Sequence, residues 1–383
     1  MIFPPEFRLL LLACRIDDAW KTVSDALELI RKTDPNWDDL CTRAAFHRVE
    51  PQLSALLGKM PESLIPAVIL DRLGFSVREN LVGQIRYVSE FFRIRDWLKG
   101  ENITVIPFKG FWLGEAMYGN IGSRVSSDID LFIDYHDLER IKKIMAGEGY
   151  TGHGSLEKLT EEYIRGELAE YNFDRYEEGV CQAHIEFHWR STMSFYRMDI
   201  GLEDMRSQIV TGTLQGREVN VFSPAANLLL VVMHHGGKEG YVQLRQALDI
   251  AHILRTKPDL DTGWLMQQAA RFHVTKLLLL GVRIAHELTG VEVPPDLARY
   301  MNGHKIKQLT KSRILLLSRP VSELQLYRER LSSWLFKIRS RDGLVVKLHL
   351  FCYTLRKILA PGLVPERWRH LFFSRKIRRP HRV

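Results

Sequence analysis

Residues 123–133, SRVSSDIDLFI, place two aspartates one residue apart within an apolar run. Aspartate is depleted in β-strands because its side chain competes for backbone hydrogen bonds. Residues i and i+2 of a strand point to the same face, so Asp128 and Asp130 are predicted to share one. Two ionised carboxylates on one face repel each other unless a cation lies between them.

The sequence around this stretch changes from helical to mixed and back to helical patterns. Helical apolar spacing occurs in residues 37–57, 81–100, 136–150 and again from Pro224 onward, where Ser223 is a predicted N-cap. Short β-branched or alternating runs predict strands at residues 103–108, 128–134 and 217–223, and a hairpin over 171–190 with its turn near Glu178 and Gly179. A short helix is expected at residues 109–119.

This order predicts an α+β fold, with a small mixed β-sheet core flanked by N-terminal and C-terminal helical segments. The predicted regions are an N-terminal helical region (1–100), an α/β core (101–223), a C-terminal helical domain (224–330) and a basic amphipathic tail (331–383).

Composition restricts the class of protein. The chain has 383 residues, of which 45% are hydrophobic and 26% are charged, as in soluble globular proteins. Its four cysteines lie far apart without a C-x-x-C pair, which argues against a disulfide framework or zinc knuckle and fits a reducing compartment. The N-terminus lacks signal-peptide features, and no apolar run approaches the ~18 residues that span a bilayer. We therefore expect a cytoplasmic protein.

The net charge of +8 is concentrated in the tail. Residues 341–383 contain eleven Lys or Arg and two acids, so the rest of the chain is near neutral. The tail begins with an apolar stripe at helical spacing, predicted to pack on the body: Leu344, Leu348, Phe351, Leu355 and Leu359. Residues 366–383 then mix aromatic and basic side chains. That mixture suits peripheral contact with an anionic membrane and equally suits RNA, whereas a solvated chain end would need no partner.

Several polar residues near the aspartate pair bear on its role. Lys109-Gly110 stands at a predicted strand-to-helix junction, where backbone N–H groups and a lysine suit phosphate binding, and Arg124 precedes the pair. A third acid, Glu186, shares a predicted strand face with two histidines in AHIEFHW. Carboxylates with phosphate oxygens are ligands for Mg²⁺.

Other interpretations remain open for these motifs. An isolated D-x-D can end a loop, with the first aspartate as a cap and the second in water. The polar face of AHIEFHW fits a solvated edge strand, or a His/Glu/His transition-metal site, which would leave Asp128 and Asp130 unexplained.

Taken together, the motifs resemble the uncharacterised bacterial nucleotidyltransferase family of the DNA polymerase β-like nucleotidyltransferase superfamily. The resemblance spans roughly residues 35–300 and rests on Lys109-Gly110, on Arg124 with D-I-D-L-F-I (128–133), and on Glu186 followed by His188-Trp189. Phe111 after Gly110, the long gap from Gly110 to Asp128, and Glu as the third acid depart from the usual superfamily pattern.

The resemblance implies a nucleotidyltransferase, an enzyme that moves a nucleoside monophosphate from an NTP, with ATP the expected donor, to a hydroxyl acceptor and releases pyrophosphate. Asp128, Asp130 and Glu186 would be catalytic and would hold two Mg²⁺ ions. Lys109, Gly110 and Arg124 would hold the triphosphate. The acceptor stays open among a small sugar or antibiotic, a peptide, a protein hydroxyl and an RNA end. The alternative is a nucleotide-binding or interaction protein that keeps the fold with weak or no turnover.

The sequence after Pro224 offers further candidates. In HHGGKEGYVQLRQALDI, residues 234–250, Lys238 could contact phosphate and Asp249 a sugar or acceptor group. The alternative for Asp249 is an i,i+4 pair with Arg245 on a solvated helix face. His234 and His235 end an apolar helix and receive no catalytic role.

Overall fold

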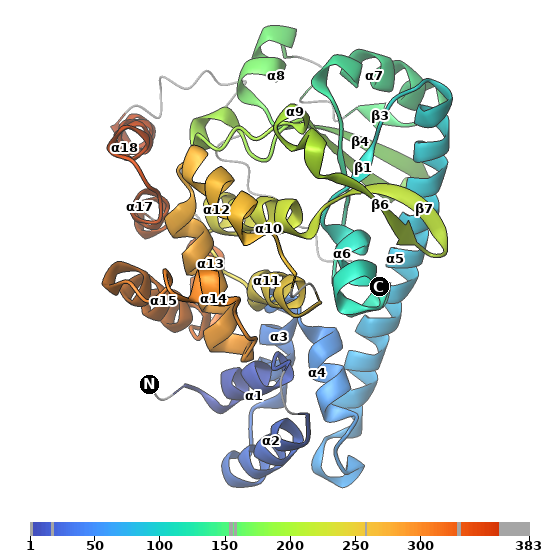
Figure 1. The fold of residues 1–383 in the computed structure, drawn as a ribbon. Helices are drawn as coiled ribbons and strands as arrows, with labels where there is room; N and C mark the ends of the chain where they lie inside the picture. Colours follow the sequence, from blue (N-terminus) through green and yellow to red (C-terminus); the bar gives the residue numbers. More distant parts are fainter. Residues whose placement is uncertain are drawn as a thin grey trace.

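The structure is a computed structural model that describes residues 3–16, 19–152, 156, 159–256, 259–327 and 331–359. It is an α+β fold in which a five-stranded mixed sheet and a separate β-hairpin lie among helices (Figure 1). The predicted fold class is confirmed. The basic residues 366–383 lie outside the described residues, so their expected partner stays a prediction.

The N-terminal part is helical. It comprises α1 (Pro5–Ala13), α2 (Ala19–Thr33), α3 (Trp37–His47), α4 (Glu50–Leu57), η1 (Glu62–Leu64) and α5 (Ala67–Gly100). Figure 1 shows α1 to α4 clustered at one end of the molecule, whereas α5 extends from them along the sheet. This single 34-residue helix connects the helical end to the α/β core.

The α/β core follows directly after α5. Its elements are β1 (Ile106–Pro107), α6 (Gly110–Tyr118), η2 (Ile121–Ser123), β2 (Ile129–Phe132), η3 (Tyr135–Asp137), α7 (Leu138–Gly147), β3 (Thr151–Gly152), α8 (Glu161–Glu167), β4 (Glu170–Glu177), β5 (Val180–His188), η4 (Ser194–Tyr196), α9 (Leu202–Met205), η5 (Arg206–Gln208), β6 (Ile209–Leu214) and β7 (Arg217–Phe222). The sheet order is β1-β2-β5-β4-β3, in which β2 and β5 run parallel and the other pairs are antiparallel.

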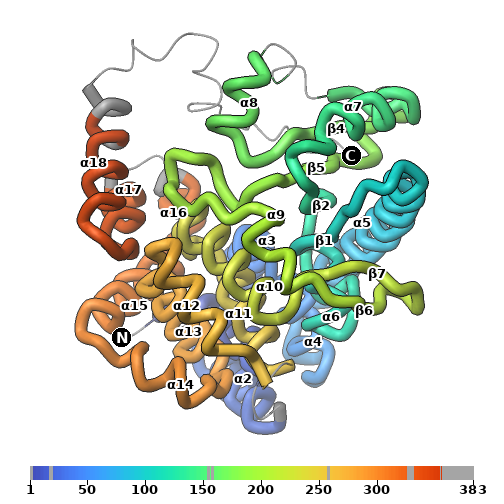
Figure 2. The backbone as a smooth tube through the Cα atoms, turned by 45° about the horizontal axis from the view of Figure 1, so that its top comes forward, coloured from blue at the N-terminus to red at the C-terminus, as the bar shows by residue number. Residues whose placement is uncertain are grey.

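The C-terminal part is again helical. It comprises α10 (Pro224–Val232), the π-helical segment η6 (Met233–Glu239), α11 (Leu244–Thr256), α12 (Thr262–Arg271), α13 (Thr275–Thr289), α14 (Pro295–Ala298), α15 (His304–Leu317), α16 (Val321–Tyr327), α17 (Leu331–Arg339) and α18 (Leu344–Leu359). Ser223 caps α10 by accepting a hydrogen bond from the Ala226 N–H, as expected. In both views α17 and α18 lie beside each other, away from the sheet (Figures 1 and 2).

One hydrophobic cluster extends through all these parts. It contains Phe7 of α1, Phe132 of β2, Leu230 of α10 and Phe336 of α17, all less than 5% exposed. All four residues of β2 are buried, so the acidic residue within that strand lies inside the protein. Because residues from all these parts contribute to one core, the predicted division of the chain into four regions stays a prediction. Among the described helices, none has the length and apolar character needed to cross a bilayer.

Some local expectations were wrong. The helical pattern of residues 37–57 forms two helices because Arg48 adopts a left-handed conformation (φ 56°) and Pro51 lies in the first turn of α4. Strand β6 was not predicted, although its hairpin partner β7 was. Helix α18 packs on the body as expected, but through Val346 and Leu350, which are 7% and 1% exposed. The predicted stripe is not the buried face, because Leu344, Leu348, Phe351 and Leu355 are 72%, 52%, 46% and 36% exposed.

The packing of α6 predicts contrasting effects of one substitution at two helical glycines. A Cβ at Gly114 would lie 2.9 Å from the Ile121 carbonyl oxygen, whereas a Cβ at Gly83 would meet no atom within 4 Å. We expect Gly83→Ala to raise the free energy of unfolding by about 0.5–1 kcal/mol, because alanine favours a helix interior. Gly114→Ala should lower it, since η2 must shift. Urea titration of both variants measures the difference, and equal effects would contradict this packing.

Candidate active site

The pairing of two parallel strands brings the acidic residues together. Asp130 of β2 lies opposite Glu186 of β5, and Phe132 lies opposite His188. Residues paired in this way point to the same face of a sheet. Side-chain donor atoms of Asp130, Glu186 and His188 lie within 4.8 Å of one another. The structure therefore unites two of the three predicted acids on one face, together with a histidine of the same motif.

Two basic groups hold the carboxylate of Asp130. The Lys109 Nζ lies 2.7 Å from Asp130 Oδ1, and both side chains are less than a tenth exposed. The His188 Nε2 lies 3.0 Å from the same oxygen. Burial opposes ionisation, but the lysine charge and the histidine hydrogen bond outweigh it and lower the pKa of Asp130. Asp130 is therefore an ionised carboxylate inside the protein.

Histidines hold the carboxylate of Glu186. The His184 Nε2 lies 3.3 Å from Glu186 Oε1, and the His188 Nε2 lies 3.4 Å from Oε2. Burial disfavours the charged histidines, but their carboxylate partners raise the pKa of His188 to about 9 and that of His184 to about 10. The same contacts overcome burial at Glu186 and hold its pKa well below the usual value.

Asp128 has a different environment from the other two acids. It lies just before β2, and its Oδ1 accepts a hydrogen bond from the Ser126 hydroxyl at 3.0 Å. Burial and the charges of Asp130 and Glu186 raise the pKa of Asp128. Ionised Asp128 thus lies in a region that already carries negative charge, and a bound cation would relieve this repulsion.

The predicted phosphate-binding turn is built from two residues with positive φ. Lys109 (φ 64°) precedes α6, and Gly110 (φ 45°) begins it. A non-glycine residue in this conformation is strained by about 1–3 kcal/mol, and such residues concentrate at functional sites. Here this backbone conformation accompanies a lysine side chain that reaches Asp130.

Arg124 and Asp249 bind each other. The guanidinium Nε and Nη2 lie 2.8 and 2.9 Å from the two carboxylate oxygens, and both side chains are at most 1% exposed. Asp249 also accepts hydrogen bonds from the Tyr118 hydroxyl and the His235 Nε2, and Arg124 donates to the Gly110 carbonyl. The predicted Arg245 contact exists at 3.7 Å, but it is buried rather than solvated.

Lys238 brings the C-terminal part to the sheet. It lies on η6, and its Nζ is 3.3 Å from Glu170 Oε2 on β4. The same oxygen of Glu170 is 3.3 Å from the His188 Nδ1. Burial opposes the charge of Lys238, but Glu170 and Glu186 outweigh it and raise the pKa of Lys238. We call Asp128, Asp130 and Glu186 the acidic cluster. Lys238 therefore adds a second positive charge beside this cluster, next to that of Lys109.

No role was predicted for Glu170, Asp174 or Tyr118. Glu170 and Asp174 lie on β4 opposite His188 and His184, and Asp174 Oδ1 lies 2.5 Å from the His184 Nδ1. The predicted turn at residues 178–179 was not enough to find these two acids, because a bulge between Arg175 and Tyr176 shifts the pairing of β4 with β5 by one residue.

The donors present fit Mg²⁺. Asp128, Asp130 and Glu186 offer carboxylate oxygens, the ligands this ion prefers. Burial and the negative charges of Asp130 and Glu186 disfavour the ionised form of Asp128, and a bound cation would offset this. His188 instead acts through a hydrogen bond to Asp130 and an ion pair with Glu186.

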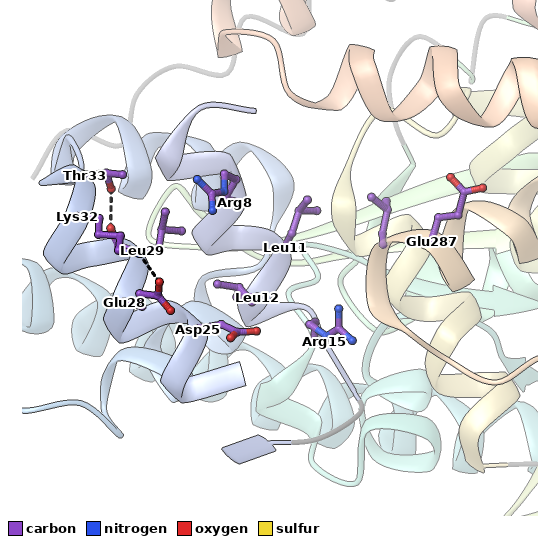
Figure 3. Close-up of a pocket in the computed structure, with 11 residues that line it drawn as sticks. Arg8, Leu11, Leu12, Arg15, Asp25, Glu28, Leu29, Lys32, Thr33 and Glu287 are labelled. Carbon is purple, nitrogen blue, oxygen red and sulfur yellow. Dashed lines mark hydrogen bonds and ion pairs between the residues drawn. The ribbon is translucent and has the colours of Figure 1, made fainter. Parts of the chain in front are cut away.

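A cavity of about 420 Å³ lies elsewhere, between α1, α2 and α13 (Figure 3). Its lining includes Arg8, Asp25 and Glu287, and Lys32 pairs with Glu28 at its edge. None of the acidic-cluster residues lines it. We therefore place the candidate chemistry at the cluster, where the charged groups converge, rather than at this cavity.

The buried Arg124–Asp249 pair predicts a large loss of stability when it is broken. Arg124→Met should lower the free energy of unfolding by about 3–5 kcal/mol, because it leaves a buried carboxylate without its main counter-charge. Arg72→Met is the matched control, since Arg72 pairs with Asp38 at 3.3 Å on the surface and such pairs contribute about 0–1 kcal/mol. Denaturant unfolding measures both. Similar small losses would show that the pair is not buried as described.

The histidine environment predicts a pH dependence. Without divalent ions, His184 and His188 gain protons on folding, because their pKa values of about 10 and 9 exceed the ~6.5 of an unfolded histidine. This contribution to stability is complete below pH ~6.5 and is lost as pH rises through 9 and 10. Unfolding in chelator from pH 6.5 to 10 should therefore show falling stability, with a shallower fall in His184→Gln. His304→Gln, which alters an exposed histidine, is the control and should keep the pH dependence of the wild-type protein. The same pH dependence in His184→Gln as in the wild-type protein would contradict this prediction.

The chain matches no curated protein. Solved structures that match include ANT(2")-Ia in complex with adenylyl-2"-tobramycin (13% identity, TM-score 0.34, 48% of this chain and 95% of that one). Others are the lincosamide antibiotic adenylyltransferase LnuA with lincomycin (16%, 0.30, 43% and 94%) and an antigenic nucleotidyltransferase-like protein from Paracoccidioides brasiliensis (13%, 0.33, 58% and 97%). These scores are too low to carry an argument about this chain.

A family match is decisive. Residues 33–290, more than half of the chain, match the family described as uncharacterised nucleotidyltransferase. This range includes the lysine-glycine turn, the D-x-D stretch, and the strand with Glu186. The resemblance drawn from these motifs is confirmed, and the chain belongs to the uncharacterised nucleotidyltransferase family.

Proposed function

We propose that the protein transfers a nucleoside monophosphate from an NTP, with ATP as the expected donor, to a hydroxyl acceptor. The observation that carries this proposal is the parallel register that sets Asp130 opposite Glu186, with Asp128 just before the same strand. Bound Mg²⁺ would supply charge stabilisation at the α-phosphate and lower the pKa of the attacking hydroxyl.

The chain's own groups have separate tasks in this reaction. Asp128, Asp130 and Glu186 hold the divalent ions. Lys109, which is buried, and Lys238, which is partly exposed, lie beside the carboxylates and are placed to bind phosphate oxygens. The N–H of Gly110, at the start of α6, adds a backbone donor to the same anion.

The reaction balances with one proton transfer. The acceptor oxygen forms a bond to the α-phosphorus, the bond from the α-phosphorus to the bridging oxygen breaks, and pyrophosphate leaves. The acceptor proton passes to a carboxylate, and Asp128, whose pKa is raised, suits this task better than Glu186, whose pKa the histidines hold low. Positioning and electrostatics account for most of the rate gain in such transfers.

Arg124 and Asp249 take a positioning role in this proposal. Their pairing and burial leave them engaged with each other, and Arg124 donates to the Gly110 carbonyl. They would therefore fix the phosphate-binding turn against α11 rather than contact the nucleotide. The expected anionic membrane or RNA contact depends on the tail beyond residue 359 and stays a prediction.

Substitution of Asp128 provides a sharp test because activity and stability should change in opposite directions. Asp128→Asn removes a buried charge that its neighbours oppose, so the melting temperature in chelator should stay equal or rise. Mg²⁺-dependent pyrophosphate release should fall by roughly 100-fold or more. The assay first measures NTP binding, and then pyrophosphate release with sugars, peptides, proteins and RNA as acceptors.

The matched control is Glu218→Gln, which neutralises an exposed acid on β7 and should keep wild-type activity. Unchanged pyrophosphate release in Asp128→Asn would overturn the catalytic assignment. NTP binding without release for every acceptor would instead favour a nucleotide-binding protein that has lost turnover.

A further inference from the structure

A second group of metal-binding side chains lies on η6, outside the acidic cluster. The Nδ1 atoms of His234 and His235 lie 3.4 Å apart. The Glu239 Oε2 lies 3.2 Å from the His235 Nδ1 and 3.6 Å from the His234 Nδ1. We propose that these three side chains form a zinc site that leaves one coordination position open.

The distances match one face of a tetrahedron. Zinc binds imidazole nitrogen at about 2.0–2.1 Å and carboxylate oxygen at about 2.0–2.2 Å, so tetrahedral ligands lie ~3.3–3.5 Å from one another. The three observed separations, 3.2, 3.4 and 3.6 Å, surround this value. A zinc ion would therefore need only small side-chain shifts. Two histidines and a carboxylate with an open fourth position are also a frequent donor set for zinc.

The tautomer of His235 favours metal binding. Its Nε2 lies 2.8 Å from Asp249 Oδ2, and a carboxylate accepts hydrogen bonds, so this nitrogen carries the proton. In the neutral ring, Nδ1 then presents its lone pair toward Glu239 and His234. Carboxylates that hold the far nitrogen of a ligating histidine are common at zinc sites, where they orient the ring and increase its basicity.

The backbone of η6 brings the three ligands together. The hydrogen bonds of a π-helix span five residues, so Glu239 lies one turn from both His234 and His235. Gly236 lets this segment pack closely, because a Cβ there would lie 2.6 Å from the Tyr241 ring. The Gln246 Nε2 donates to Glu239 Oε2 at 2.6 Å and orients that carboxylate. Such π-helical segments occur frequently at functional sites.

The site is accessible and is separate from the Mg²⁺ ligands. The side chains of His234 and Glu239 are 12% and 17% exposed, so an ion could enter, whereas His235 is fully buried. Its nitrogen donors suit zinc, and the carboxylate oxygens on the sheet suit Mg²⁺. A bound ion would fix the segment that carries Lys238, which contacts Glu170 of the sheet.

The test measures metal content and uses no nucleotide. The full chain is treated with chelator, reloaded with Zn²⁺, freed of excess ion and analysed by mass spectrometry for bound metal. We expect one zinc per chain, a higher melting temperature with zinc, and strong visible absorption of the Co²⁺-loaded protein, typical of tetrahedral coordination. His234→Ala and Glu239→Gln should each weaken zinc binding by more than the ~10–100-fold that loss of an outer-shell partner causes.

Two control variants locate the ion. His304→Ala removes an exposed histidine on α15, and Glu186→Gln alters the acidic cluster; both should keep the zinc. Melting curves in chelator establish that the variants are folded. Absence of zinc from the wild-type chain would show that protons alone hold the three side chains together and would overturn the proposal. Zinc that is lost in Glu186→Gln but retained in His234→Ala and Glu239→Gln would also overturn it.

Discussion

Burial of like charges on adjacent strands is the constraint around which the α/β core is arranged. The parallel pairing of β2 and β5 sets Asp130 beside Glu186 inside the protein. Such a pair is tolerable only with nearby counter-charges. The chain supplies them from three separate segments: Lys109 before α6, the histidines of β5, and Lys238 of η6. The same cations that stabilise the acids in this structure are also suited to meet the phosphates of a nucleotide.

The Arg124–Asp249 pair extends this arrangement into the C-terminal helices. It joins the loop before β2 to α11, and through the Gly110 carbonyl it reaches the phosphate-binding turn. A contact of this kind between residues 125 positions apart fixes the orientation of two chain segments. Asp249 also accepts a hydrogen bond from His235, a ligand of the proposed zinc site. The carboxylate of Asp249 therefore connects the phosphate-binding turn with the proposed zinc site.

The sequence predicted what depends on local periodicity. Alternation identified the strands with Asp130 and Glu186, and the positive-φ turn at Glu178 and Gly179 was predicted from its residues. The interaction partner of a charged side chain was harder to predict from the sequence. Arg124 carries the same charge whether it meets phosphate or Asp249, and only the tertiary fold decides. Strand β6 escaped prediction because Gly212 within it weakens the strand pattern.

A single irregularity shows why full register is hard to predict. Counting back from the hairpin turn pairs Tyr176 with Cys181, but the bulge after Arg175 shifts every later pair by one residue. Because side chains alternate with period two, that shift decides which residues of β4 face the histidines. It places Glu170 opposite His188 and Asp174 opposite His184, so these carboxylates add to those of Asp130 and Glu186 in raising the pKa of the two histidines. Charge balance in the site thus depends on one extra residue in a strand.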